Sequence, residues 1–345
     1  MVRGLRVERR EGLLLALKRA GGPTAFGEIA PLPGLHDETL EDARRSLSGV
    51  VPMLPGLLAC SPQERRLKLE AALLPPSVAT GVEMALLNFD ASLAGSLPPL
   101  PAAFPPARLL AVNALLAGDP ETVMARAATC HVAGFRTFKL KVQAGRIEEA
   151  IACIRAFHGA FGDTSELRLD ANQSMELEEA IEFGRSIPPG SVSYIEEPVQ
   201  DASLIPEFHA ATRIHSALDE TLWQRPGMLE ALPPESLGAL VLKPNRLGGI
   251  MRSLDLAALA LRMGLATVFS SAFETGVSLG MYALMAAISS PQPQACGLDT
   301  ISFLDHDLLE SPFATPGGEV DPLAAWHNGT AVRQDLLIRE ASWTW

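Results

Sequence analysis

The sequence is constrained most strongly by a regular series of charged residues, each placed directly after a short apolar run. Asp170 ends Leu-Arg-Leu, Glu196 follows Tyr-Ile, Asp219 follows Ala-Leu and Lys243 follows Leu-Val-Leu. The steps between these residues are 26, 23 and 24 positions, each about the length of one strand–helix unit. If the apolar runs are consecutive parallel strands, the four charged groups emerge together at the carboxyl edge of one sheet.

Eight strand candidates alternate with amphipathic stretches in the second part of the chain. The strand candidates cover residues 108–116, 136–142, 167–170, 193–197, 215–219, 237–243, 266–270 and 295–299. Helical spacing of apolar residues occurs between most of them, over 120–133, 148–161, 176–187, 249–263 and 277–289. Eight such units in about 190 residues predict a (β/α)8-type barrel, a modified TIM barrel, with the charged groups at its mouth. A doubly wound open sheet is the alternative, but no glycine-rich phosphate loop follows the first strand.

The first part of the chain follows a different pattern. Apolar runs over 12–18 and 24–30 flank a Gly-Gly-Pro turn and predict a hairpin, and helical spacing follows from about residue 37, over 64–73 and over 76–93. A proline-rich stretch over 95–106 is typical of a linker. These patterns predict an α+β capping domain over 1–97, the barrel over 98–305, and a C-terminal return segment over 306–345 that packs on the cap or the barrel.

Composition and charge exclude several classes of protein. The formal net charge of −12 argues against nucleic acid or an anionic lipid surface as a partner. No apolar run approaches the roughly 18 residues needed to span a membrane, and the first residues lack the pattern of a signal peptide. The four cysteines are scattered, without metal-type spacing or a disulfide framework. We therefore expect a cytoplasmic protein that acts on a small molecule, and the oligomeric state is left open.

Two lysines share one face of the strand candidate 136–142. Because side chains alternate along a strand, Lys139 and Lys141 emerge side by side, and the neighbouring positive charge lowers the pKa of at least one of them. A lysine tuned in this way can serve as a base near neutral pH. Taken alone, the pattern also fits a basic edge strand in contact with water. Its place one strand before Asp170 favours a functional site.

The three carboxylates indicate a metal. A single aspartate after a strand can be a helix N-cap, but like charges on successive strands repel by about 4 kcal/mol per pair at roughly 4 Å and an effective dielectric constant of about 20. Three oxygen ligands suit a hard cation, most simply Mg²⁺, with Mn²⁺ as a substitute. The seven histidines show no HxH or HExxH spacing, which argues against transition-metal chemistry. A metal flanked by lysines is suited to removing the proton beside a bound carboxylate.

Several stretches carry a resemblance to a known family. The Lys-x-Lys strand, Asp170-Ala-Asn, Glu196-Glu-Pro, Asp219-Glu and Lys243-Pro resemble the active-site motifs of the enolase superfamily, in its muconate-cycloisomerase-like branch. The stretches 27–34 (GEIAPLPG), 76–79 (PSVA), 81–82 (GV), 270–274 (SSxFE) and 297–300 (GLDT) resemble the o-succinylbenzoate synthase family of menaquinone biosynthesis. These matches run from about residue 10 to 305 and cover both the predicted cap and the predicted barrel.

The resemblance implies a reaction and a role for the main residues. The reaction is the syn dehydration of a succinyl-hydroxycyclohexadiene carboxylate to o-succinylbenzoate, catalysed by a carbon–oxygen lyase and driven by aromatisation. Asp170, Glu196 and Asp219 would hold Mg²⁺. Lys141 would remove the proton and then protonate the departing hydroxyl. Lys243 would stabilise the enediolate from across the ring, electrostatically or through a cation–π contact.

The resemblance also implies contacts to the substrate. Lys139 would keep the pKa of its neighbouring lysine low and touch the substrate carboxylate, and Arg168 would be a further contact. The cap loop over 28–34 would cover the succinyl group and exclude water. The chain departs from the family at two places: its first hairpin strand begins close to the start, and Ala272 and Thr275-Gly276 stand where relatives often carry serines.

Three other functions stay open at this stage. N-acylamino acid racemisation uses the same metal site with both lysines as bases, so the presence of Lys141 and Lys243 does not separate the two reactions. A dipeptide epimerase tends to carry Asp-x-Asp on the eighth strand, where this sequence has only Asp299. A barrel that binds a carboxylate without turnover would be expected to lack a member of the lysine and carboxylate set, and none is missing.

Overall fold

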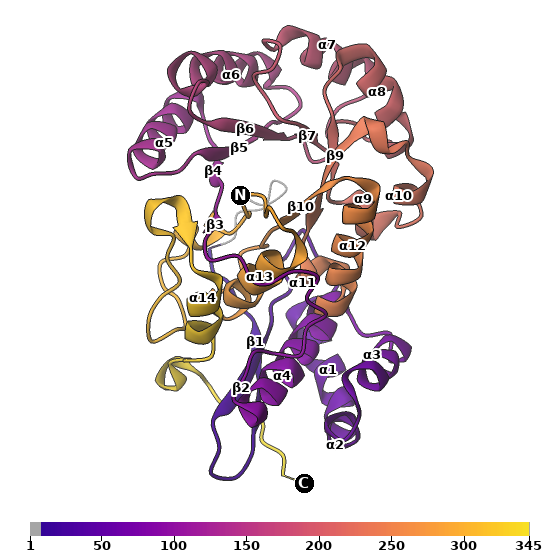
Figure 1. Ribbon diagram of the computed structural model, residues 1–345, viewed down its shortest axis with the longest axis vertical. Coiled ribbons are helices and arrows are strands. Elements are labelled where there is room, and N and C mark those ends of the chain that lie inside the picture. The colour runs from indigo at the N-terminus through magenta and orange to yellow at the C-terminus, as the bar shows by residue number, and fades with distance from the viewer. Residues whose placement is uncertain (1–7, 345) are drawn as a thin grey trace.

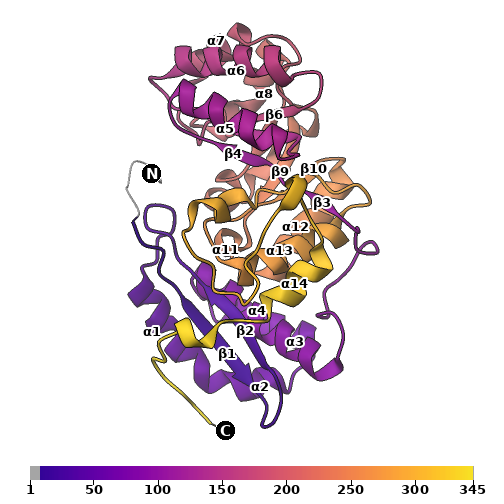
Figure 2. The ribbon, with the colours of Figure 1, turned by 90° about the vertical axis from the view of Figure 1, so that its left-hand side faces the viewer.

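The computed structural model describes residues 8–344, with the N-terminal hairpin and helices packed beneath a barrel (Figures 1 and 2). The strands are β1 (Leu13–Lys18), β2 (Thr24–Ile29), β3 (Leu110–Ala111), β4 (Ala114–Leu116), β5 (Thr137–Lys141), β6 (Glu166–Asp170), β7 (Ile195–Glu196), β8 (Ser216–Leu218), β9 (Leu237–Leu242), β10 (Ala266–Phe269) and β11 (Glu319–Val320). The α-helices are α1 (Leu40–Val50), α2 (Leu54–Leu58), α3 (Pro62–Ala71), α4 (Pro76–Ala94), α5 (Pro120–Val132), α6 (Ile147–Phe161), α7 (Leu177–Ser186), α8 (Ile205–Thr212), α9 (Thr221–Gln224), α10 (Met228–Ala231), α11 (Pro244–Leu247), α12 (Ile250–Met263), α13 (Gly276–Ser289) and α14 (Pro322–Gly329). None of the helices in this range is long and apolar enough to cross a membrane.

The predicted barrel is confirmed, but its eighth strand is reduced to single bridges. Seven parallel strands form one sheet in the order β10-β9-β8-β7-β6-β5-β4. Cys296 then bridges to Val112 beside β4, and Gly297 bridges to Ser270 at the end of β10. These bridges join the two edges of the sheet at a narrow seam. The eighth segment stays short because the chain turns into a 3₁₀ helix at Asp299–Phe303 directly after it.

The seam is reinforced by the aspartate of the GLDT stretch. Asp299 Oδ2 accepts hydrogen bonds from the Leu115 backbone N–H at 2.8 Å and from the Arg126 guanidinium at 2.6 Å. The single strand predicted over 108–116 is split here, because β3 pairs antiparallel with β11 while β4 pairs parallel with β5. Asp299 therefore holds β4 and α5 to the closing segment of the barrel.

The predicted N-terminal hairpin is present and packs closely on α4. β1 and β2 pair antiparallel, and β2 lies against α4. A Cβ at Gly27 would lie 1.9 Å from the carbonyl oxygen of Gly81, and a Cβ at Gly81 would lie 2.3 Å from Ile29 Cγ1. Only glycine permits this approach of strand and helix. Two of the stretches that carry the family resemblance, 27–34 and 81–82, thus meet at this contact.

The hydrophobic side chains form a cap core and a larger core that also takes in Phe26, Met84 and Leu87 of the cap. The cap core gathers around Leu54, Val82 and Leu86, and the larger core lies between the barrel strands and their helices, around Phe138 and Leu169. The C-terminal residues contact both parts, because α14 packs on α13 and Glu340 pairs with Arg44 of α1 at 2.7 Å. The predicted division of the chain at residues 97 and 305 stays a prediction.

Candidate active site

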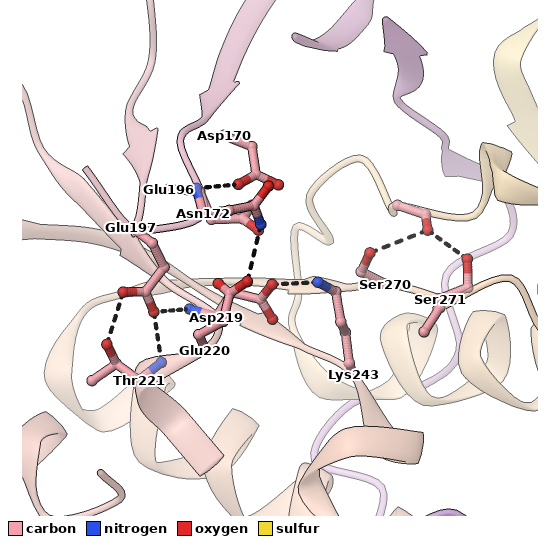
Figure 3. A network of polar contacts seen from close by, with 12 residues as sticks. Asp170, Asn172, Glu196, Glu197, Asp219, Glu220, Thr221, Lys243, Ser270 and Ser271 are labelled. Atoms are coloured by element: carbon pink, nitrogen blue, oxygen red, sulfur yellow. Dashed lines mark hydrogen bonds and ion pairs between the residues drawn. The ribbon is translucent and has the colours of Figure 1, made fainter. Parts of the chain in front are cut away.

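Strand register brings the predicted residues to one end of the barrel. Lys141 is paired with Asp170 across β5 and β6, and Asp170 with Glu196 across β6 and β7. Asp219 directly follows β8 and Lys243 directly follows β9. Figure 3 shows carboxyl groups from these strand ends gathered together, with Lys243 reaching toward Asp219. The periodic spacing in the sequence therefore corresponds to a cluster in space.

The lysine ammonium groups lie against the carboxylates. Lys139 Nζ is 2.7 Å from Asp170 Oδ2 and 2.7 and 2.8 Å from the two oxygens of Glu196. Lys141 Nζ is 2.5 Å from Asp170 Oδ2, and Lys243 Nζ contacts Asp219 Oδ2. Of the three lysine side chains, that of Lys141 is the most accessible at 31% exposed, while the other two are 10% exposed. Lys141 is thus the lysine best placed to meet a substrate.

Burial and ion pairing shift the pKa values of the clustered carboxylates and lysines in different directions. Burial raises the pKa of Asp170, but the surrounding lysines outweigh it and hold that pKa below its usual range. Burial, and then the charge of Asp170, raises the pKa of Glu196 well above its ordinary value. Burial likewise raises the pKa of Asp219 to about 6. Burial lowers the pKa of Lys243, but Asp219, Glu196 and Glu220 together outweigh burial, and the pKa rises to about 12.

The donor atoms suit a hard divalent cation. As the side chains lie, no three Asp, Glu, His or Cys side chains within residues 8–344 converge on a metal position, because lysines lie against the same oxygens. Asp170, Glu196 and Asp219 are nevertheless fully buried and offer only oxygen ligands. Asp219 Oδ1 is buried without a hydrogen-bond partner. Carboxylate oxygens are the ligands that Mg²⁺ prefers, and one of these oxygens has no protein partner among the described residues, so the residues fit this ion.

Arg168 is not brought to the site. It precedes Asp170 by two residues on the same strand face, which places it about 7 Å deeper in the barrel. Its Nε donates to Glu166 Oε1 at 2.9 Å, and one terminal nitrogen donates to the Ala295 carbonyl at 2.8 Å. Glu166 begins β6, so the guanidinium makes its contacts toward the amino end of the barrel strands. The structure therefore gives no support to the predicted contact between Arg168 and the substrate.

Asn172 is a site residue to which the sequence analysis gave no role. Its Oδ1 lies 2.9 Å from Lys141 Nζ, and its Nδ2 donates to Glu220 Oε1 at 3.0 Å. The backbone of Asn172 has a φ of 46°, a left-handed conformation that asparagine tolerates better than most residues. Its place in the Asp-Ala-Asn motif was the signal that could have identified it.

Glu197 has a supporting position beside the site. Its Oε1 accepts hydrogen bonds from the backbone N–H groups of Asp219 at 2.8 Å and Thr221 at 2.7 Å. Its Oε2 accepts from the Thr221 hydroxyl at 2.8 Å (Figure 3). Burial raises the pKa of Glu197 to about 7. Glu196 and Glu197 are adjacent in sequence, yet Glu196 meets Lys139 while Glu197 fixes the turn that carries Asp219.

The cap loop docks on the barrel next to this cluster. The Glu28 carboxylate accepts hydrogen bonds from the backbone and hydroxyl of Thr275, both at 3.0 Å, and from the Ser278 backbone at 3.2 Å. Asn245 Nδ2 donates to the Ala30 carbonyl at 2.9 Å. Thr275, the N-cap residue of α13, therefore ties the cap to that helix. Coverage of a succinyl group by this loop stays a prediction.

Comparison with known proteins decides the family. The model described as "Enolase C-terminal domain-like" matches residues 122–334, and the model described as "MenC, N-terminal domain" matches residues 1–89. The o-succinylbenzoate synthase of Aliivibrio salmonicida is 30% identical over 319 residues, which cover 92% of this chain and 89% of that protein. The chain belongs to the o-succinylbenzoate synthase family of the enolase superfamily. The predicted family and its enzyme class, the carbon–oxygen lyases, are thereby confirmed.

Further proteins are similar to this chain in sequence or in structure. The chloroplastic protein PHYLLO of Arabidopsis thaliana is 32% identical over 87% of this chain, and the match spans 20% of its own length. The L-Ala-D/L-Glu epimerase from Bacillus subtilis superposes with a TM-score of 0.81 at 23% identity, covering 93% of this chain and 91% of that one. An enolase superfamily member from Roseovarius nubinhibens, complexed with magnesium, gives a TM-score of 0.76 at 19% identity, covering 90% and 85%. These two structures show that this member of the o-succinylbenzoate synthase family has the fold of the superfamily.

Proposed function

We propose that this chain is a Mg²⁺-dependent o-succinylbenzoate synthase that dehydrates 2-succinyl-6-hydroxy-2,4-cyclohexadiene-1-carboxylate in menaquinone biosynthesis. One arrangement carries the proposal. Lys141 ends β5 and Lys243 directly follows β9, and these strands are four positions apart in the barrel sheet and so lie on opposite sides of it. At the ends of the three strands between them lie Asp170, Glu196 and Asp219.

Each residue of this arrangement has a distinct task in the dehydration. Mg²⁺ held by Asp170, Glu196 and Asp219 would supply Lewis-acid stabilisation of the negative charge that develops on the substrate carboxylate. Lys141 Nζ removes the proton from the carbon beside that carboxylate. The same ammonium group then gives a proton to the hydroxyl as its C–O bond breaks, so that water leaves from the same face. The ring becomes aromatic in this second step.

The other lysines and Asn172 support this step. Asn172 Oδ1, at 2.9 Å from Lys141 Nζ, orients the amine that carries the proton. Lys139 is bonded to two of the carboxylates and limits their repulsion, and its tuning of the pKa of Lys141 stays a prediction. Lys243 keeps its charge, since its pKa is raised to about 12, and stabilises the developing negative charge from the opposite side.

A racemase acting on N-acylamino acids is the second candidate, because a lysine on each side of the site also suits proton transfer on both faces of a substrate. A dipeptide epimerase is disfavoured by the position of Asp299. This carboxylate is engaged by Leu115 and Arg126 at the seam, so the eighth segment offers no free aspartate to a substrate amine.

A paired assay separates the two candidates. Purified protein with Mg²⁺ is given the cyclohexadiene substrate while absorbance is followed, and separately an N-acylamino acid in D₂O while α-proton exchange is followed by NMR. We expect rapid aromatisation that stops when Mg²⁺ is removed by EDTA. No absorbance change together with rapid α-proton exchange would instead assign the chain as a racemase.

A further inference from the structure

The loop that carries Lys243 is bonded to a helix of the cap. We define the β9 loop as residues 243–251, from the end of β9 to the start of α12. The Thr80 hydroxyl of α4 lies 2.8 Å from the carbonyl oxygen of Pro244, the residue after the lysine, and 2.9 Å from that of Pro76 in its own helix. Thr80 is fully buried and Pro244 is buried as well. Figures 1 and 2 both show α4 running beneath α11, the short helix in the middle of the loop.

The far end of the β9 loop is held by the same helix. Glu83 Oε2 accepts hydrogen bonds from the backbone N–H groups of Ile250 at 2.6 Å and Met251 at 3.2 Å. These groups open α12, whose own N-cap residue is Gly249 and has no side chain to satisfy them. A Cβ at Gly249 would lie 2.6 Å from Glu83 Oε2, so the glycine makes room for the carboxylate. The cap therefore supplies the missing N-cap group of a barrel helix.

A third cap contact lies next to the first, near the start of the loop. The Leu32 backbone N–H donates to His36 Nδ1 at 3.0 Å, which leaves Nε2 as the protonated nitrogen of the ring. His36 Nε2 then donates to the Asn245 carbonyl at 3.1 Å. Burial, and then the charge of Arg246, lowers the pKa of His36 to about 3, so the ring stays neutral. The β9 loop is thus bonded to the cap near its start and at its end.

We infer that Thr80 and Glu83 are positioning residues for Lys243, which they hold against Asp219 through the backbone of the β9 loop. The catalytic consequence of this inference rests on the proposed function, since it requires Lys243 to act on the substrate. The structural part does not, because it concerns only where the lysine lies. No comparable contact from the cap is needed at Lys141, whose partners Asp170 and Asn172 both belong to the barrel.

Two pairs of variants test the inference in the Mg²⁺-loaded full-length protein. Thr80→Val removes the hydroxyl at nearly constant volume, and Thr80→Ser restores it. Glu83→Leu removes the acceptor for the α12 N–H groups, and Glu83→Gln retains one. We expect kcat to fall about tenfold or more in the valine and leucine variants with KM nearly unchanged, because small misplacements of catalytic groups are costly. The serine and glutamine variants should return kcat to within about threefold of wild type.

The matched control is Arg66→Gln, which removes a different contact between cap and barrel, the ion pair of Arg66 with Asp255 on α12. We expect kcat of this variant to equal that of wild type. An equal fall of kcat in Arg66→Gln would overturn the inference, since any loosening of the cap would then suffice.

A second measurement is independent of turnover. The chain contains five lysines, so the ¹³C-labelled lysine side chains give a simple NMR spectrum in which Lys243 is assigned with Lys243→Ala. We expect the Lys243 signal to shift or broaden in Thr80→Val and Glu83→Leu, while Lys139 and Lys141 keep theirs. An unchanged Lys243 signal in Thr80→Val would overturn the inference, even if Glu83→Leu fails to fold. If the wild type does not turn over the cyclohexadiene, the proposed function fails, and this spectrum still decides the position of the lysine.

Discussion

Lys141 and Lys243 face the same site from opposite sides, but different parts of the molecule support them. Lys141 is bonded to Asp170, which ends the next barrel strand, and to Asn172 just after it, and remains 31% exposed. Lys243 is buried against Asp219, and its loop is bonded to the cap. The barrel alone therefore builds one side of the site, whereas the other side depends on how the cap is docked. Variants on the two sides should differ in their balance between turnover and stability.

The largest effect on turnover is expected from Lys141→Ala. This change removes the proposed proton carrier, and general acid–base groups contribute about 10²–10⁴-fold to rates. Stability should change little, because the side chain is partly exposed and Asp170 keeps its contact with Lys139. Steady-state kinetics and the thermal unfolding midpoint measure both quantities. A near-normal kcat would show that another residue is the base.

A smaller loss of turnover but a larger loss of stability is expected from Lys243→Ala. The change leaves Asp219 buried without its ammonium partner, and breaking a buried ion pair in this way costs about 3–5 kcal/mol. Urea unfolding measures this cost. α-Proton exchange of the two enantiomers of an N-acylamino acid then identifies the role of the lysine. Loss for one enantiomer alone indicates a base, and equal loss for both indicates electrostatic stabilisation.

Of these three variants, Glu83→Gln is expected to have the smallest effect on turnover. It tests instead how the stability contributed by this cap residue depends on pH. Burial raises the pKa of Glu83 to about 7 from an ordinary 4.5, so the folded state favours the protonated form. This contribution to stability is complete below pH 4.5 and is lost as the pH rises through 7. Between pH 5 and 8, the free energy of unfolding of the wild type should therefore fall by up to about 3 kcal/mol relative to that of Glu83→Gln. Urea unfolding of both proteins across this range measures the difference, and a difference independent of pH would contradict the assigned pKa.

The barrel and its charged cluster could be predicted because both depend on short-range patterns. Parallel strands place their carboxyl ends together, so a charged residue at each strand end, spaced by one unit, predicts a shared site. The first cap helix was predicted to begin near residue 37, whereas the capping box of Thr39 and Asp42 sets the first helical residue of α1 at Leu40. The single strand expected over 108–116 divides, because its two halves pair with different partners.

The contacts between cap and barrel could not be predicted in the same way. Thr80 and Pro244 are 164 positions apart, and neither residue type indicates a partner. Arg168 shows a related difficulty, because strand alternation gave its face correctly but not its depth. A side chain on the inner face of a barrel can extend toward either end of the barrel, and tertiary packing alone decides which partner it contacts. The residues that anchor the cap thus carried no local signal.

The narrow seam has a consequence for how the barrel moves. Only a few backbone hydrogen bonds close the ring there, among them Cys296 N–H to the Ala111 carbonyl and Gly297 N–H to the Phe269 carbonyl, both at 2.8 Å. Regions with few such bonds open locally before the rest of a fold. Amide hydrogens of residues 295–299 should therefore exchange with solvent ahead of those in β5–β9. Local opening would part β10 from β4 while the strands that carry the carboxylates stay paired.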